Sequence, residues 1–131
     1  MSAGIITTCR WNDPPNPGEG TRLLVTRYRP RGVSKADETW DEWDADLGPS
    51  VALHAAAYGK GVLQIPWQTY RVRYLTEMRQ QRDRIAALAK RVVAGENVAL
   101  LCSSACDRES RCHRSLLKEL IEAEMRKELN L

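Results

Sequence analysis

Hydrophobic positions along the chain fall into short apolar runs and longer stretches with a helical period. Apolar runs over 5–10, 21–28 and 97–102 predict three strands, two of them continuously apolar and therefore buried on both faces. A helical period follows each of the last two runs, and the final helix is expected from about 112 to 129. This alternation predicts an α/β fold: a small parallel sheet with helices on both faces, in a single domain of residues 1–131.

Turn-forming and capping residues predict further boundaries. The stretch 12–20 is rich in Pro, Gly and Asn and is expected to be a loop. Ser34 resembles a helix cap and predicts a short helix that carries Trp40, Trp43 and Leu47 on one face. Ser50 and Gly59 are expected to start and end another short helix.

Two stretches leave the element assignment open. Residues 67–94 have a helical pattern that fits one long helix, Trp67–Ala94, or two helices with a break near Asp83. The predicted strands are few, and residues 61–66 are the best candidate for an additional one. The sheet is therefore expected to be small.

Composition narrows the class of protein. The chain has 131 residues, 43% of them hydrophobic and 28% charged, with a net charge of +3, as in an ordinary globular domain. No apolar run approaches the roughly 20 residues that span a bilayer, and the first residues lack the features of a signal peptide. We therefore expect a cytoplasmic protein without membrane contact, whose four cysteines are reduced.

The segment 98–114 concentrates the candidate chemistry, because it holds three of the four cysteines and one of the two histidines. Cys112 lies where the last helix is expected to begin, beside His113 and Arg114. A helix N-terminus and neighbouring cations both stabilise a thiolate. The pattern therefore predicts a depressed pKa and a nucleophilic role for Cys112, or an acid/base role for His113, with Arg114 steering charge. The alternative is that these cysteines are small core residues.

A metal site is a further alternative. Cys102, Cys106, Cys112 and His113 are four zinc-type ligands within twelve residues. Their spacing, Cys-x3-Cys-x5-Cys-His, is not that of a standard zinc knuckle or finger. A zinc-stabilised domain therefore stays an alternative, and no metal ligand is assigned. Redox pairing of Cys106 with Cys112 across the loop is another alternative, without the support of a Cys-x-x-Cys motif.

Two loops are expected to meet at one edge of the sheet. In a parallel sheet, the residues after the second strand and those after the third open on the same side, where ligands bind. The sequence therefore predicts an anion site for a small phosphate-bearing or nucleotide-like ligand. Its expected ligand-binding residues are Arg27, Arg29, Arg31, Lys35, Ser103 and Ser104. The alternatives are a solvated basic loop and a non-catalytic module that binds nucleic acid.

Several stretches resemble a bacterial family of unknown function, DUF488, and within it the YeaO-like branch. The element Arg-x-x-Pro-Arg-Gly-x-Ser-Lys of residues 27–35 is typical of the branch, and Leu-Leu-Cys with Cys-His-Arg, within 100–114, is typical of the broader family. The resemblance also covers 14–22, 48–50 and 70–78. It implies a compact α/β domain of the cytoplasm, but neither a reaction nor a cofactor.

The chain departs from the family pattern at three places. Thr26 stands where the branch often has aspartate, and residues 103–105 are Ser-Ser-Ala where the broader family tends to have an acidic residue. Cys106 matches no cysteine of the family, which weakens the zinc alternative. Substrate, reaction and oligomeric state remain open from the sequence.

Overall fold

Four short parallel strands form the sheet. The computed structural model describes residues 2–106 and 108–130, and within them the strand order is β1-β4-β2-β3. The strands are β1 (Ile6–Arg10), β4 (Val98–Cys102), β2 (Thr21–Leu24) and β3 (Glu42–Trp43), and every pairing is parallel. β4 lies between β1 and β2 and is buried at all of its positions. The expected α/β class with a small parallel sheet is confirmed.

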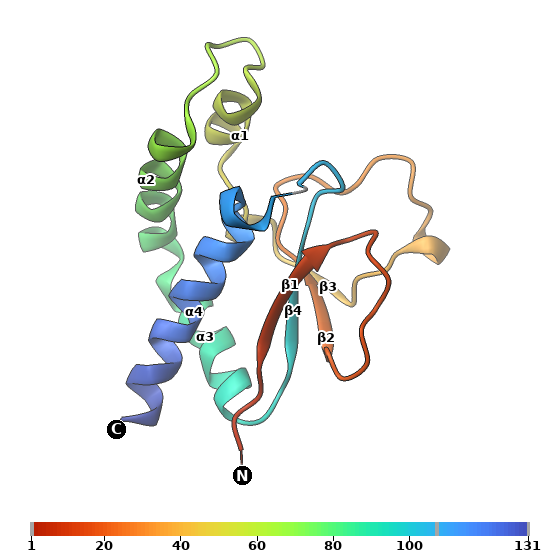
Figure 1. Ribbon diagram of the computed structural model, residues 1–131, viewed down its shortest axis with the longest axis vertical. Coiled ribbons are helices and arrows are strands. Elements are labelled where there is room, and N and C mark those ends of the chain that lie inside the picture. Colours follow the sequence, from red (N-terminus) through yellow and green to blue (C-terminus); the bar gives the residue numbers. More distant parts are fainter. Residues whose placement is uncertain (1, 107, 131) are drawn as a thin grey trace.

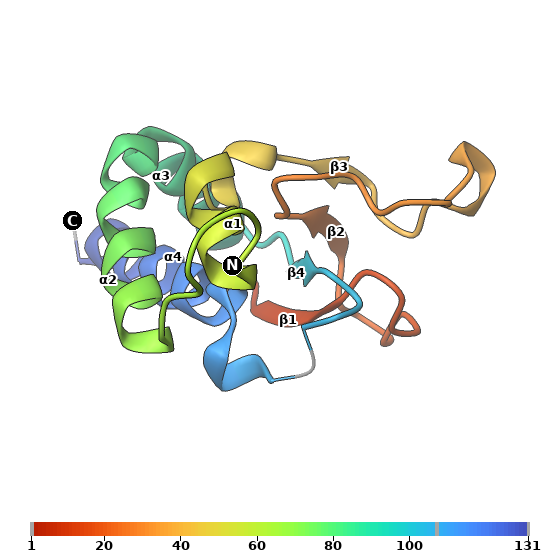
Figure 2. The same cartoon turned by 90° about the horizontal axis from the view of Figure 1, so that it is seen from above.

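The α-helices lie on one side of this sheet (Figures 1 and 2). They are α1 (Val51–Tyr58), α2 (Trp67–Met78), α3 (Arg82–Val93) and α4 (His113–Leu129). Alternate sheet residues such as Leu23, Val25 and Leu100 pack against them in the larger core, together with Leu117 and Ile121 of α4. Of the helices in the described ranges, none has the length and apolar character needed to cross a membrane.

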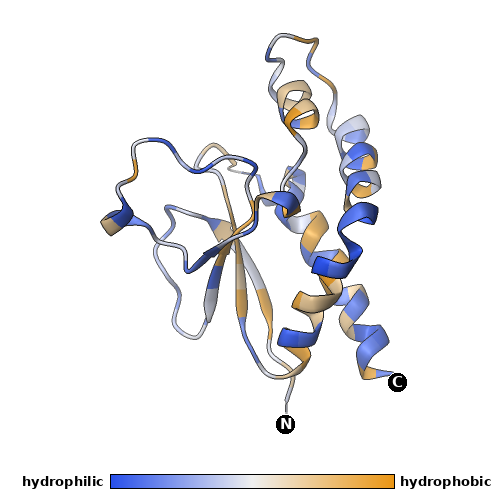
Figure 3. Ribbon diagram, turned by 180° about the vertical axis from the view of Figure 1, so that it is seen from behind, coloured by the Kyte–Doolittle hydropathy of each residue, from blue (hydrophilic) through white to orange (hydrophobic). Residues whose placement is uncertain are grey.

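The opposite face of the sheet carries loops instead of the helices expected on both faces. Leu24, Ala99 and Leu101 form a smaller core there, covered by residues that include Trp11 and Trp40. The covering segments are rich in turn formers, so they pack as extended chain and leave the helices to the other side. Coloured by hydropathy, these loops are largely hydrophilic, whereas the strands carry hydrophobic residues (Figure 3).

The segment after Ser34 also differs from the prediction. It forms a single 3-10 turn, Lys35–Asp37, and then the two-residue strand β3, which was not predicted. The Ser34 hydroxyl donates to the Asp37 carboxylate at 2.8 Å instead of capping a backbone N–H, so no α-helix is started. Residues 61–66, the candidate for an additional strand, form no strand.

Other boundaries agree with the capping pattern. Ser50 Oγ accepts from the Leu53 N–H at 3.1 Å and caps α1, and Gly59 ends it with a φ of 68°, which favours glycine. The long helical stretch is two helices, α2 and α3, separated by a 3-10 turn at Arg79–Gln81. α1 and the start of α2 lie beyond the carboxyl ends of the strands (Figure 1).

Candidate functional site

The carboxyl ends of β2 and β4 open into a cavity of about 1140 Å³. Because β2 and β4 pair in parallel, the segment after each strand lies on the same edge of the sheet. The segments 26–31 and 102–106 both line the cavity, as do residues of α1 and the beginnings of α2 and α4. The two loops expected to meet therefore do meet.

The cavity has a basic lining and an aromatic lining. Five arginines line it: Arg27, Arg29, Arg31, Arg108 and Arg111. The aromatic lining comes from Tyr28, His54, Tyr58, Trp67 and Tyr70, along with Trp11. Neighbouring rings of this set contact one another, with centroids 4.9 Å apart for both Tyr28–His54 and His54–Tyr58. A cavity with cations and exposed ring faces suits an anion attached to a planar group.

Two of the predicted arginines are already engaged. Arg29 donates to the Glu38 carboxylate at 2.8 and 3.1 Å, and Arg27 donates to the Pro49 carbonyl at 2.8 Å and to Asp46 at 3.4 Å. Arg31, in contrast, is exposed and makes no ion pair with other described residues. The same holds for Arg108, Arg111 and Lys60 within the described ranges, and the Lys60 ammonium lies 5.5 Å from the centroid of the Tyr58 ring. Arg31, Arg108 and Arg111 are therefore the arginines available to a ligand.

Lys35 does not line the cavity. It begins the 3-10 turn Lys35–Asp37, on a loop that extends away from the helices in both ribbon views (Figures 1 and 2). The structure therefore does not bring Lys35 together with the arginines that line the cavity.

The predicted serines both line the cavity. Ser103 Oγ accepts from the Ala105 N–H at 3.1 Å, and the Ser104 carbonyl accepts from Arg10 at 3.4 Å. Both contacts hold the turn after β4 in shape. The turn closes with a hydrogen bond from the Cys106 N–H to the Ser103 carbonyl at 3.0 Å.

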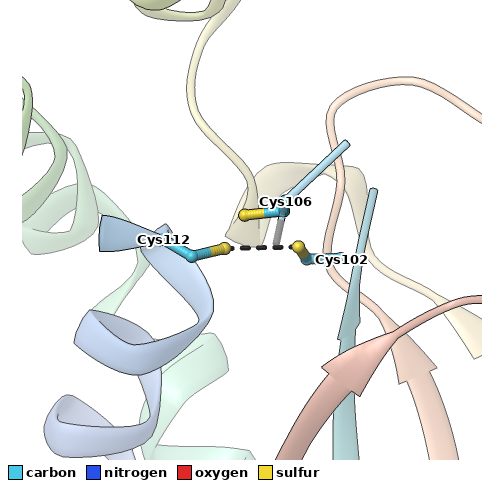
Figure 4. Close-up of side chains that lie close together, drawn as sticks. All are labelled: Cys102, Cys106 and Cys112. Atoms are coloured by element: carbon cyan, nitrogen blue, oxygen red, sulfur yellow. Dashed lines mark hydrogen bonds between the residues drawn. The ribbon is translucent and has the colours of Figure 1, made fainter. Parts of the chain in front are cut away.

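Three cysteine sulfurs converge at this turn (Figure 4). Cys102 ends β4, Cys112 is the residue before α4, and Cys106 lies on the loop between them. The three Sγ atoms all lie within 4.8 Å of one another, and those of Cys102 and Cys112 are 3.2 Å apart. Cys102 and Cys112 are buried, whereas Cys106 is partly exposed. Three sulfurs at these separations also satisfy the distance requirement of a metal site.

Cys106 is the sulfur best placed to carry a negative charge. Hydrogen bonds from the thiols of Cys102 and then Cys112 lower the pKa of Cys106 to about 3, and the positive charge of Arg114 acts in the same direction. The hydrogen bond with Cys102 lowers the pKa of Cys112, but the bond to Cys106 and burial outweigh it and raise that pKa to about 12. The expected depressed pKa is thus found at Cys106 and not at Cys112.

His113 and Arg114 are both buried. His113 Nε2 lies 2.7 Å from the carbonyl oxygen of Val25, and since a carbonyl only accepts, this nitrogen carries the proton and donates. The contact joins the start of α4 to the end of β2. The Nε and Nη1 atoms of Arg114 are buried without a hydrogen-bond partner among the described residues. A buried guanidinium without hydrogen-bond partners is stabilised by a nearby negative charge. The charge of Arg114 in turn favours the Cys106 thiolate.

Burial lowers the pKa of His113 below its ordinary 6.5, which favours the neutral ring in the folded protein. Below pH 6.5 the unfolded chain binds a proton there that the folded chain does not, so stability falls as the pH falls. We expect the free energy of unfolding to drop by up to about 1.4 kcal/mol per pH unit in this range. His113→Gln, which keeps a donor for Val25, should flatten this slope in urea denaturation measured from pH 7 to 5.

His54→Gln is the control for this measurement. Partial burial, and then the charge of Lys60, lower the pKa of His54 as well, but its ring is only partly buried. We therefore expect a smaller change in slope than for His113→Gln. Equal slopes in the wild-type protein and His113→Gln would contradict the assignment of a neutral, buried His113.

Comparison with known proteins places the chain in a family. The model of DUF488-N3a, described as the active DUF488-N3 subclade, matches residues 6–125. The uncharacterized protein YeaO of Escherichia coli (strain K12) is 39% identical over 82 residues, which are 60% of this chain and 69% of that protein. No solved structure matches. The resemblance seen in the sequence is confirmed, and the chain belongs to the DUF488-N3a family.

Proposed function

We propose that the protein binds a small phosphate-bearing, nucleotide-like ligand in the cavity and presents the Cys106 thiolate to it as a nucleophile. One observation carries the proposal: the arginines without ion pairs among the described residues and the partly exposed Cys106 line the same cavity. Catalysis by cysteine needs a thiolate that is accessible to its substrate. Cys102 and Cys112 are buried, so their part is to donate S–H hydrogen bonds to Cys106.

Charge complementarity supports an anionic ligand. A phosphate would be repelled by the thiolate unless cations lie between or around them. Arg31, Arg108 and Arg111 line the cavity and make no ion pair inside the described ranges, so they can donate charge-assisted hydrogen bonds to a phosphate. The positive charge of the buried Arg114 also favours the thiolate, because it lowers the pKa of Cys106.

The aromatic lining supports a planar group on the ligand. Tyr28 and Tyr58 expose about half of their surface, at 51% and 50%, on either side of His54. Burying an exposed ring face against a base or another ring contributes about 1–3 kcal/mol. The cavity volume is large enough for a nucleotide, given that ligand pockets range over about 300–1,000 Å³.

Calorimetry with inorganic phosphate and with nucleoside monophosphates tests this proposal. Arg31→Ala and Arg108→Ala should each weaken binding by about tenfold or more, because each removes a charge-assisted hydrogen bond. Lys35→Ala is the matched control, since it removes a cation from the same basic segment but outside the cavity. Binding that all three variants weaken equally would reject a site at the cavity, as would no binding at all.

Protection of Cys106 gives a second readout. Bound phosphate or nucleotide is expected to slow alkylation of Cys106 by iodoacetamide in the unmodified protein. The alternative function, a nucleic-acid-binding module, would instead show affinity for an oligonucleotide that falls steeply with salt and no protection by a mononucleotide. The concave placement of the arginines favours the small ligand over an extended strand.

A further inference from the structure

We infer that the three cysteines form a peroxide-reducing relay, in which Cys106 is oxidised and Cys112 closes a disulfide with it. This activity goes beyond ligand binding and shares with the proposed function only the reactive sulfur of Cys106. Its basis is the juxtaposition of one accessible thiol with two buried thiols, all three Sγ atoms within 4.8 Å of one another.

The geometry provides a resolving thiol without a large rearrangement. A disulfide bond is about 2.05 Å long, so two cysteines that lie far apart cannot form one without backbone movement. Here Cys106 lies on a short loop whose two ends, Cys102 and Cys112, carry the other two sulfurs (Figure 4). The neighbouring Sγ atoms of Cys102 and Cys112 are already in contact at 3.2 Å.

The first step takes place at Cys106, the partly exposed member of the cluster. The Cys106 thiolate attacks one oxygen of a hydroperoxide, an S–O bond forms and the O–O bond breaks. The leaving oxygen departs with the electron pair and is protonated to water or an alcohol, so the sulfur is oxidised by two electrons and the peroxide is reduced. The product at Cys106 is a sulfenic acid.

The second step follows from the order in which the thiols lose their protons. While Cys106 is a thiolate, its negative charge and hydrogen bond help to keep Cys112 protonated. Oxidation of Cys106 removes that charge, whereas the thiol of Cys102 still favours a Cys112 thiolate, as does the start of α4. The Cys112 sulfur then attacks the Cys106 sulfur, an S–S bond forms, the S–O bond breaks, and hydroxide leaves as water after taking a proton.

Cys102 stays reduced in this scheme, and its hydrogen bond helps to hold the negative charge on Cys106. Its sulfur also accepts from the Cys112 thiol at 3.2 Å, and its own thiol lies 3.6 Å from the Ser103 carbonyl, which accepts. Cys9 takes no part, because it packs on the opposite, helix-free face of the sheet. Overall, one hydroperoxide and two thiols yield one disulfide, one water and one water or alcohol. A dithiol reductant returns the protein to its starting state.

The test treats the fully reduced protein with one equivalent of hydrogen peroxide and maps disulfides by mass spectrometry. We expect a loss of two hydrogens and a Cys106–Cys112 link in the wild type, in Cys9→Ser and in Cys102→Ser. In Cys112→Ser the sulfenic acid at Cys106 should persist and be trapped by dimedone. In Cys106→Ser we expect peroxide consumption to fall to the rate of an exposed, unactivated thiol.

Three outcomes would overturn the relay: a Cys102–Cys112 link as the main product, sulfinic acid at Cys106 in the wild type, or no dimedone adduct in Cys112→Ser. The wild-type mapping needs no substitution, so a variant that fails to fold does not decide the result. Phosphate binding and its loss in Arg31→Ala are measured separately, with all four cysteines present. Failure of the ligand proposal and failure of the relay are therefore distinguishable.

Discussion

Cys106 is expected to react with iodoacetamide at nearly constant rate from pH 5 to pH 8. With two S–H donors, its pKa is lowered from 9.0 to about 3, so the thiolate already predominates at pH 5. Cys9 has a pKa raised above 9.0, chiefly by burial, and should react only slowly over the same range. Peptide mapping after short exposures at each pH distinguishes the four thiols. A Cys106 rate that rises tenfold per pH unit up to pH 8 would contradict the assignment.

Cys102→Ala gives the largest expected change in this rate. It removes the hydrogen bond that contributes most to lowering the pKa of Cys106. Each unit by which the pKa rises above the working pH lowers the thiolate fraction tenfold. Cys102→Ser is the control, because its hydroxyl still donates to the thiolate. We expect alkylation at pH 5 to slow in the order wild type, Cys102→Ser, Cys102→Ala. Equal rates in all three proteins would show that Cys102 does not hold the charge on Cys106.

The cavity edge was predictable because strand direction follows from the pattern of elements. Continuous apolar runs joined through helices predict parallel strands, and parallel strands bring the residues after β2 and β4 to one side. The position of the Cys112 side chain at a helix start was predictable for the same kind of reason, since the helical period of α4 begins there.

The role of Cys106 was not predictable from spacing. Cys106 reaches the other sulfurs only because the turn after β4 folds back, with the Cys106 N–H bonded to the Ser103 carbonyl. A turn of this kind has no periodicity, and its only signal was the pair of serines that form it. A helix was wrongly predicted after Ser34 for the same reason. The Ser34 hydroxyl contacts the Asp37 side chain instead of capping a helix.

The sequence also did not indicate which surface charges form ion pairs with one another. Arg29 and Arg31 are two residues apart, yet the first is bound to Glu38 and the second makes no ion pair with described residues. β3 is two residues long, too short for an alternating pattern, and its pairing with β2 depends on the fold of the preceding loop. These features arise from contacts between distant segments, which composition and periodicity do not report.

Arg22→Met is expected to destabilise the protein by about 3–5 kcal/mol, the range for breaking a buried ion pair. Arg22 is 5% exposed and pairs with Glu19, which is 6% exposed, on the helix-free side of the sheet. Its guanidinium also donates to the carbonyls of Thr39, Trp11 and Asp13, at 2.8, 3.3 and 3.2 Å. Removing it leaves a buried carboxylate and three acceptors without these donors. Urea denaturation at pH 7 measures the loss.

Two further variants distinguish the cost of leaving a buried charge unpaired from the cost of losing any arginine. Arg84→Met removes the ion pairs with Asp44 and Asp46 on the surface and is expected to cost less than about 1 kcal/mol. Glu19→Gln combined with Arg22→Met should recover part of the loss, because no unpaired charge is then buried. A loss for Arg22→Met no larger than for Arg84→Met would contradict the role of Arg22. Trp11 is bound through its carbonyl to Arg22 and lines the cavity, so the destabilised variant should also bind phosphate more weakly.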